Sequence, residues 1–258
     1  FNKMIKSFVG FVLRLLPRPF LQSISKPIFK GISIFYLGNK VECPICNSSF
    51  SKFFPYGRVS RDNALCTNCL SLERHRLIYL FLKRKTTLFK EQNNLLHIAP
   101  EECLIKKFKE NKNINYTSAD LESPLADIKM DIHKMPFDNN SFDFVLCNHV
   151  LEHVENDLQA LKEIKRVLRK GGKGIVQVPF YFPIPEETKE DKKIISKKER
   201  EIIYGQSDHV RKYGKDYKKR LESSGFKVTV TLPSEFLKKS EIELYRIAKS
   251  EEIYLINN

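Results

Sequence analysis

The sequence predicts an α/β fold in which a doubly wound, mostly parallel sheet follows a small cysteine-rich module and a helical arm. From residue 94 onward, short apolar runs alternate with amphipathic stretches. Such alternation is typical of β-α-β units and a parallel sheet. Two C-x2-C pairs and a basic, proline-interrupted N-terminal segment precede this region. These three observations predict three parts, at residues 1–38, 39–85 and 94–258.

Residues 1–38 predict a basic amphipathic helical arm, because lysines and arginines recur among apolar clusters and three prolines divide the segment into short helices. Two interpretations remain open: the arm packs on the main domain, or it lies on an anionic membrane surface. The apolar run over residues 8–16 is too short to span a bilayer, and Arg14 interrupts it. No transmembrane span is expected.

The cysteine module has the pattern C-x2-C-x19-C-x2-C, formed by Cys43, Cys46, Cys66 and Cys69. Two thiolates across a tight turn can hold one side of a tetrahedral ion, and a second pair completes the shell. The pattern predicts a zinc ribbon or knuckle, with four unligated thiols as the alternative. A closed shell of four thiolates leaves no position for water, so such a zinc is structural. Four arginines could offset its negative charge: Arg58, Arg61, Arg74 and Arg76.

Residues 71–85 predict a helix that links the module to the main domain, since apolar side chains recur there at steps of three and four. The chain has six cysteines and shows no secretory signal, which indicates a reducing compartment. We therefore expect a cytoplasmic protein, and the basic arm also allows a peripheral location at the inner face of the membrane.

In the main domain, short apolar runs predict strands at residues 95–98, 115–119, 141–147, 174–179, 226–232 and 252–256. Helices are expected over residues 102–110 and 157–170, the second ending at Gly171-Gly172. Residues 186–220 are highly charged and favour helix, and residues 183–215 predict a lid-like insertion.

Two aspartates follow predicted strands at positions that suit a nucleotide-like ligand. Asp120 follows the second strand, about 21 residues after the first strand-to-helix turn, and such an acid can accept from ribose hydroxyls. Asp131 can accept from an adenine amino group, with Met130 and Ile132 on either side of the ring.

Longer stretches resemble a known family. DIHKMPFDNNSFDFVLCNHVLEHV followed by ALKEIKRVLRKGGKGIVQVP is similar to class I S-adenosylmethionine (SAM)-dependent methyltransferases of the type 11 methyltransferase-domain group. The resemblance covers roughly residues 94–182 and implies a Rossmann-like, seven-stranded sheet, SAM as cofactor and methyl transfer. More narrowly, NALCTNCLSLERHR, HIAPE and GQSDHVRKYGKDY resemble a bacterial subset with an N-terminal four-cysteine zinc module.

The first strand-to-helix turn departs from the glycine-rich pattern of that family, since it contains no glycine. The resemblance places cofactor contacts at this turn on His97, Ala99, Pro100 and Glu101. Glu101, or carbonyls around Ala99, would accept the methionine ammonium of SAM; the alternative is that the site is lost. The remaining expected cofactor-binding residues are Asp120, Leu121, Asp131, Ile132, Asn148 and His149.

Methyl transfer needs a base only where the nucleophile loses a proton. The candidates are His209, with Asp208 beside it, and His149 after the fourth strand. Tyr181, Arg211 and Tyr213 could line the same opening.

The methyl acceptor is open. A small-molecule, glycan or lipid-linked acceptor is favoured, with RNA and a non-catalytic SAM-binding role as alternatives. A net charge of +14 suits RNA, but a generally lysine-rich proteome explains it equally well. No D/N-P-P-Y/F tetrapeptide follows the fourth strand, which disfavours a methylase of nucleobase amines.

Overall fold

A computed structural model describes the chain over residues 28–57 and 59–258. The described residues form two compact units, one of residues 28–57, 59–80 and 237–248 and another of residues 81–236 and 249–258. Most of the predicted basic arm lies outside the described residues, as does Arg58, so the membrane-surface interpretation stays a prediction. Within the described ranges, no helix combines the length and the apolarity needed to cross a bilayer.

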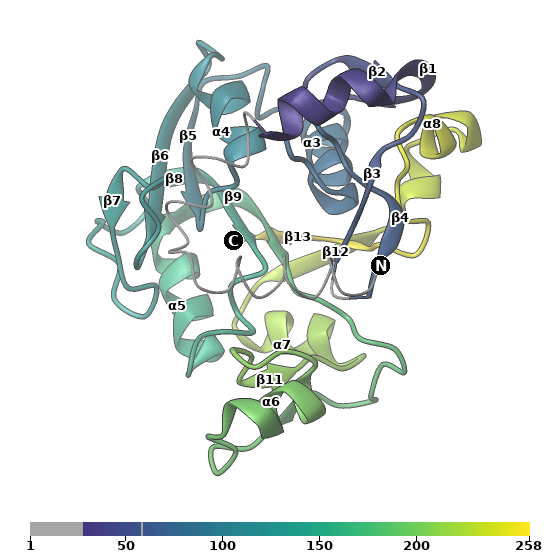
Figure 1. Cartoon of the computed structure of the whole chain (residues 1–258). Coiled ribbons are helices and arrows are strands. Elements are labelled where there is room, and N and C mark those ends of the chain that lie inside the picture. The colour runs from purple at the N-terminus through teal and green to yellow at the C-terminus, as the bar shows by residue number, and fades with distance from the viewer. Residues whose placement is uncertain (1–27, 58) are drawn as a thin grey trace. The chain divides into compact units, whose positions relative to one another are not determined.

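The first unit contains two small antiparallel hairpins and a short helix from late in the sequence. Its strands pair as β1 with β2 and β3 with β4 (Figure 1). The elements are η1 (Ile34–Tyr36), β1 (Leu37–Cys43), β2 (Ser48–Phe50), β3 (Phe54–Tyr56), β4 (Arg61–Leu65) and α8 (Lys239–Leu244). Helix α3 (Glu73–Lys85) begins here and runs into the second unit, and it starts two residues later than predicted.

A buried arginine holds the first unit together. The Arg76 guanidinium lies 4.4 Å from the centroid of the Phe53 ring and is fully buried. It donates to five backbone carbonyl oxygens, those of Asn63, Ala64, Ser71, Tyr245 and Arg246. Arg76 therefore joins residues around the cysteine pairs to a segment about 170 positions later in the chain.

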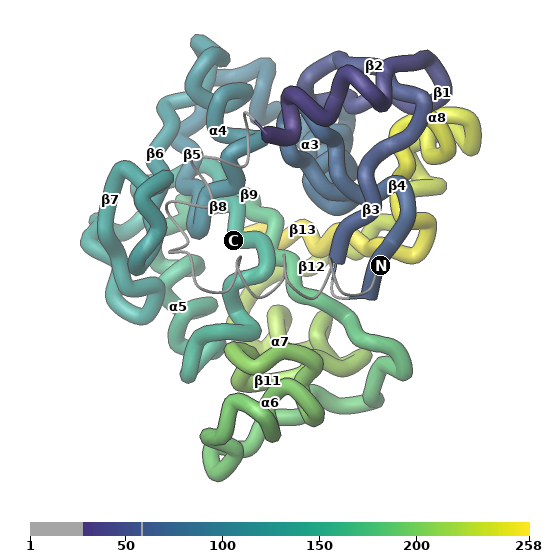
Figure 2. Tube along the Cα trace, in the orientation of Figure 1, coloured from purple at the N-terminus to yellow at the C-terminus, as the bar shows by residue number. Residues whose placement is uncertain are grey.

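The second unit is built on a seven-stranded sheet in the order β12-β13-β9-β8-β5-β6-β7. All neighbouring strands pair in parallel except β13, which lies antiparallel between β9 and β12. Figure 2 shows the C-terminal β13 beside β9 although their sequences are far apart. The strands are β5 (Asn93–Ile98), β6 (Ile114–Asp120), β7 (Ile128–Lys129), β8 (Phe142–Asn148), β9 (Leu168–Gln177), β12 (Lys227–Thr231) and β13 (Ile253–Asn257). The predicted α/β class with a Rossmann-like, mostly parallel sheet is confirmed.

The helices α4 (Glu102–Lys109), α5 (Asp157–Val167) and α7 (Tyr217–Ser223) cover this sheet. Successive side chains of a strand point to opposite faces. On β5, Leu96 belongs to the cluster that includes α5 and α7, whereas the neighbouring His97 ring packs edge-on against Phe108 of α4. The sheet is therefore covered on both faces, as the prediction of a doubly wound sheet requires.

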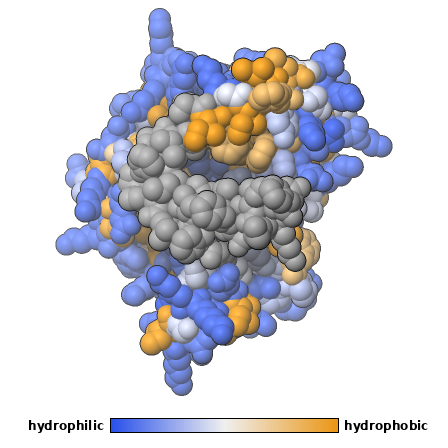
Figure 3. Space-filling model, in the orientation of Figure 1, coloured by the Kyte–Doolittle hydropathy of each residue, from blue (hydrophilic) through white to orange (hydrophobic). Residues whose placement is uncertain are grey.

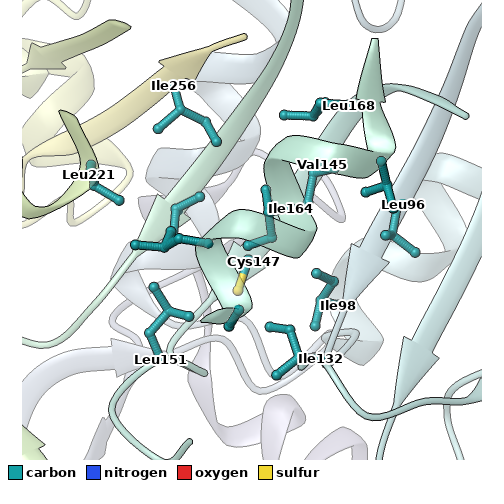
Figure 4. Packing of buried hydrophobic residues seen from close by; sticks show 14 of the residues in the cluster. Leu96, Ile98, Ile132, Val145, Cys147, Leu151, Ile164, Leu168, Leu221 and Ile256 are labelled. Atoms are coloured by element: carbon teal, nitrogen blue, oxygen red, sulfur yellow. The ribbon is translucent and has the colours of Figure 1, made fainter. Parts of the chain in front are cut away.

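The core on the α5 face is continuous and apolar. Figure 4 shows Ile164 of α5 packed with Val145 and Cys147 of β8 and with Ile98 of β5. All four side chains are at most 3% exposed. A buried aliphatic side chain contributes about 1.5–3 kcal/mol, so this cluster fixes the register of the parallel strands. The carboxyl ends of β5 and β8 are thereby held at fixed positions.

The predicted end of the helix over residues 157–170 is wrong. Helix α5 ends at Val167, and strand β9 begins at once with Leu168, which pairs with Phe142 of β8. Gly171, with a φ of 75°, lies within a bulge of β9 instead of ending a helix. Pairing with β8 overrides the helical preference of Leu168 and the residues after it.

Residues 183–215, the expected lid, contain α6 (Lys197–Tyr204) and an antiparallel pair of short strands, β10 (Lys189–Glu190) and β11 (Arg211–Lys212). Where it is coloured, the face in Figure 3 is mainly hydrophilic, but hydrophobic side chains also reach the surface around α6. Ile202 of α6 is 74% exposed. A 3-10 turn, η2 (Pro233–Glu235), follows β12.

Candidate functional site

The site lies where the strand order of the sheet reverses. Strand β5 pairs with β6 on one side and with β8 on the other, so the chain leaves β5 in one direction and returns on the opposite side. In open α/β sheets, ligands bind outside the carboxyl ends of the strands at such a switch point. Ala99, Asp120 and His149 follow the carboxyl ends of these strands or lie at them.

The turn after β5 has the backbone shape of a glycine turn, although it contains no glycine. Ala99 adopts a left-handed conformation with a φ of 52°, and its N–H donates to the carbonyl of Ala119 on β6 at 2.9 Å. This conformation costs an L-residue roughly 1–2 kcal/mol. Pro100 follows and is buried. The turn therefore sends the chain into α4 while Ala99 keeps the side chain at this position small.

The side chain of Glu101 bridges β5 and β8. Its Oε2 lies 2.6 Å from Nε2 of His97, and its Oε1 accepts from Nδ2 of Asn148 at 2.5 Å. His97 is fully buried, and its Nδ1 lies 3.1 Å from the hydroxyl of Tyr116. A neutral His97 that donates from Nε2–H to the carboxylate accepts from Tyr116 on its other nitrogen, which satisfies both ring atoms.

These contacts hold a carboxylate at the end of β5. The Glu101 side chain is 14% exposed, so it is largely sheltered from water yet still reachable from one side. Tyr116, which orients His97, was not among the predicted site residues. The signal for it is weak in the sequence, because one tyrosine within a strand is more often a packing residue.

Asp120 ends β6, and its Oδ1 accepts from the backbone N–H groups of Glu122 at 2.7 Å and Ser123 at 2.6 Å. No bond to Oδ2 is found among the described residues, so this oxygen remains able to accept. Leu121 beside it is 55% exposed. The arrangement suits an acid that would accept from vicinal hydroxyls.

Asp131 and Ile132 lie on the loop between β7 and β8. The Asp131 carboxylate accepts from the backbone N–H of His133 and lies 2.7 Å from its ring Nδ1, and these bonds lower the pKa of Asp131. Ile132 is only 6% exposed and packs in the core, as Met130 does. A role for Asp131 and Ile132 in binding adenine stays a prediction.

Four polar side chains gather after the carboxyl end of β8. His149 has a φ of 58° and lies with Nδ1 3.4 Å from Oε1 of Glu152. His153 has its Nε2 3.8 Å from the same oxygen, and its ring packs edge-on against that of His209, with 4.8 Å between centroids. The main chain aligns these residues, since the N–H of Val210 donates to the carbonyl of Glu152 at 2.9 Å.

Glu152 and His209 are buried, at about 1% exposure each. Burial lowers the pKa of His209, which favours its neutral form. Burial alone would raise the pKa of Glu152, but the hydrogen bond with His149 and the neighbouring His153 lower it below its ordinary value. Asp208 is exposed, and its Oδ2 lies 3.6 Å from Nδ1 of His153. The predicted catalytic residues His149, Asp208 and His209 are thus brought together around Glu152 and His153.

The expectation that Arg211 and Tyr213 line the opening is wrong, because both side chains are buried in the interior. Arg211 donates to the carbonyls of Leu151, Val154 and Glu155 and pairs with a carboxylate of β10. It therefore fixes the loop that carries Glu152 and His153. Tyr181 is half-buried, and its ring lies 5.8 Å from that of His209.

Tyr213 belongs to a network that sequence reasoning missed. Its hydroxyl donates to the Asp157 carboxylate at 2.8 Å, and Arg220 donates to both oxygens of that group at 2.6 and 2.7 Å. Asp157 is the first residue of α5, so this network fixes the helix next to the loop of Glu152.

The four cysteines of the first unit converge as their spacing predicted. The Sγ atoms are 3.6 Å apart for Cys43 and Cys69 and 3.7 Å for Cys46 and Cys66. Thiolates about 2.3 Å from a tetrahedral zinc lie about 3.8 Å apart, so the separations fit that ion. All four sulfurs lie within 4.8 Å of one another.

The two cysteine pairs have equivalent turns. The N–H of Asn47 donates to the carbonyl of Cys43 at 2.8 Å, and the N–H of Leu70 donates to that of Cys66 at 2.9 Å. Both Asn47 and Leu70 are left-handed, with φ values of 57° and 60°. A repeated turn of this kind presents two thiols on one side, which is the arrangement of a zinc knuckle.

Part of the sheet region is similar to a known sequence family. Residues 88–176, which begin before β5 and end within β9, match a family described as a methyltransferase domain. The chain is 56% identical over 48 residues to an uncharacterised protein of Methanocaldococcus jannaschii, covering 19% of this chain and 21% of that protein. It is 50% identical over 42 residues to demethylmenaquinone methyltransferase of Staphylococcus epidermidis, covering 16% and 17%.

The chain thus spans about a fifth of the length of these curated relatives. Among solved structures, it is similar to a SAM-dependent methyltransferase from Archaeoglobus fulgidus, with a TM-score of 0.48 and 13% identity over 73% of this chain and 95% of that one.

Proposed function

We propose that this protein is a SAM-dependent methyltransferase with a structural zinc in its first unit, acting on a small-molecule, glycan or lipid-linked acceptor. The observation that carries the proposal is the methyltransferase-domain match over residues 88–176, because those residues contain β5, β6 and β8 with the polar groups at their carboxyl ends. The left-handed Ala99 supports it, since the turn keeps its shape without glycine.

The residues at the switch point fit SAM. When bound, SAM supplies an electrophilic methyl group on a sulfonium. Glu101, held by His97 and Asn148, would accept from the methionine ammonium, and this contact would replace a glycine-rich turn as the anchor. Asp120 would accept from the ribose hydroxyls through Oδ2. Leu121, Asp131 and Ile132 would then lie on the adenine side.

The group after β8 would serve the acceptor. Asn148 contacts Glu101, and His149 follows it directly, so the cofactor side and the acceptor side share one short segment. His209, whose pKa burial lowers, would accept the proton of an acceptor hydroxyl, and Asp208 and His149 would lie beside it as further polar groups. Residues 183–215 would act as a lid that keeps water away.

The cysteine cluster of the first unit would hold zinc. The sulfur separations fit the ion, and four thiolates would give it a net charge of −2, which the buried Arg76 guanidinium would partly offset. Such a site stabilises the fold and leaves no open position for the acceptor.

The test is calorimetric titration of the full chain with SAM, followed by transfer of tritium-labelled methyl groups from SAM to fractionated cell extract. We expect binding, and label in a small-molecule or glycolipid fraction. Label in RNA, together with RNA binding that weakens steeply with salt, would favour the RNA alternative. Binding without transfer to any fraction would indicate a SAM-binding protein, and no binding of SAM would overturn the proposal.

A further inference from the structure

We propose a second metal site in this chain: Glu152, His153 and His209 bind a divalent transition-metal ion of the zinc class. One ligand atom from each residue lies within 4.8 Å of the others. All three residues belong to the second unit, whereas the four cysteines belong to the first. The inference does not rest on methyl transfer, because it concerns only what these side chains can hold.

The first support is that buried polar atoms here are poorly satisfied. His209 is 1% exposed; the backbone of Tyr204 interacts with its ring, but neither ring nitrogen reaches hydrogen-bonding geometry with a described residue. The same holds for Oε2 of Glu152, whose side chain is 1% exposed. Leaving a buried polar group unpaired costs about 1–3 kcal/mol, and more when the group is charged. The poorly satisfied ring of His209 beside the unpaired Oε2 of Glu152 favours a bound ion at this place.

The second support is the geometry of the donors. The rings of His153 and His209 lie nearly perpendicular, at 85°, with centroids 4.8 Å apart. Ligand atoms bound at about 2.0–2.1 Å from a tetrahedral ion lie roughly 3.3 Å from one another. The three donor atoms, now within 4.8 Å of one another, would therefore move slightly closer together on binding. His153 is the more exposed member, with 37% of its side chain accessible, and its ring can turn toward the other two.

The third support is that the surroundings hold these donors in place. Val210 bonds the backbone of Glu152, and Arg211 bonds carbonyls on both sides of Glu152 and His153. His149 and Asp208 contact Glu152 and His153 from the outside. A metal ligand is commonly oriented by such outer contacts, which fix the tautomer of an imidazole and the direction of a carboxylate.

The donor set determines the class of ion. Imidazole nitrogens suit zinc, cobalt, nickel, copper and iron, whereas magnesium and calcium prefer oxygen ligands. Two imidazoles and one carboxylate give three protein ligands and leave a position open to water or to an oxygen of another molecule. With a metal bound, His209 would be a ligand instead of a proton acceptor, and the open position would be the reactive one.

Zinc analysis of the full chain tests the proposal, because the two sites differ in ligands. After zinc loading and removal of loosely bound metal, wild type should hold about two zinc ions per chain, with both sulfur and nitrogen/oxygen ligands by X-ray absorption. His153→Gln and Glu152→Gln should each reduce this to about one ion, with sulfur ligands alone. Conversely, a Cys43→Ser and Cys46→Ser double variant should keep the nitrogen/oxygen site.

The matched control is His133→Gln. His133 belongs to the same unit but contacts Asp131 instead of Glu152 or His209. This variant should keep both ions. His153→Gln is the primary variant because its side chain is partly exposed, and circular dichroism verifies that each variant folds. The proposal is overturned if wild type holds a single ion with sulfur ligands only, or if His153→Gln and Glu152→Gln both keep the second ion.

Discussion

The Glu101 carboxylate at the start of α4 accepts a hydrogen bond from Asn148 at the end of β8, and this contact adds a side-chain link between the turn after β5 and the carboxyl end of β8. His97 holds the other carboxylate oxygen from inside the sheet. The acid is therefore fixed in direction before any ligand arrives. A fixed carboxylate binds a cation without losing side-chain entropy at that moment, and this preorganisation favours affinity.

Glu101→Gln should weaken SAM binding by at least about tenfold, because it would remove the charge proposed to face the ammonium and would turn an amide toward the Asn148 amide. Calorimetric titration measures the change. Glu110→Gln, on an exposed residue at the end of the same helix, should leave the affinity unchanged. Equal affinities for wild type and Glu101→Gln would show that the ammonium is bound elsewhere.

Ala99→Gly should leave the free energy of unfolding unchanged or raise it by up to about 1.5 kcal/mol. Relief of the left-handed strain is partly or fully offset by the greater freedom of glycine in the unfolded chain. Ala119→Gly, in the fully buried part of β6, should cost about 1 kcal/mol because no strain is relieved there. Urea unfolding compares the two variants. A loss at Ala99 as large as that at Ala119 would contradict the argument.

Asp157→Asn should destabilise the second unit by about 3–5 kcal/mol at neutral pH, because Arg220 and Tyr213 lose a buried carboxylate. Burial alone would raise the pKa of Asp157, but the bonds from Arg220, with Arg211 nearby, lower it below its ordinary value. Its stabilising contribution is thus present above the unfolded pKa of about 3.9 and is lost as the pH falls through the lower folded pKa.

The difference in stability between wild type and Asp157→Asn should therefore shrink below about pH 4 and stay constant above about pH 5. Urea unfolding across this range tests the sign. Asp138→Asn, on an exposed residue, should stay within about 0.5 kcal/mol of wild type throughout. A difference that grows on acidification would mean that the pKa is raised instead.

Removal of zinc by a chelator should open the first unit and leave the second folded. Limited proteolysis should then cut between residues 28 and 80, while the segment from 81 to 236 resists cleavage. Cys66→Ser should reproduce the effect without chelator. Cys103→Ala, at a buried cysteine of the second unit, should not sensitise residues 28–80. Equal cleavage of both units would show that they unfold together.

Much of the second unit was readable in the sequence because its strands are continuous apolar runs, as for Leu95, Leu96 and Ile98. The cysteine cluster was readable for a related reason: its geometry depends on two local turns. The early end of α5 could not be predicted from the sequence, because Leu168 belongs to a strand only through its pairing with Phe142. The gathering of Glu152 and His209 depends equally on tertiary structure, as does the bond of Arg76 to Tyr245.

The bonds of Arg76 to Tyr245 and Arg246 also have a consequence for biosynthesis. A chain made from its N-terminus exposes the four cysteines long before residue 246 leaves the ribosome. Until then, the Arg76 guanidinium lacks two of its acceptors. The first unit therefore stays incomplete until most of the sheet region has been translated. If the cysteines bind zinc as proposed, the early chain can bind the metal before the first unit is complete. A nascent chain stalled before residue 245 would then hold zinc while Arg76 lacks its bonds to Tyr245 and Arg246.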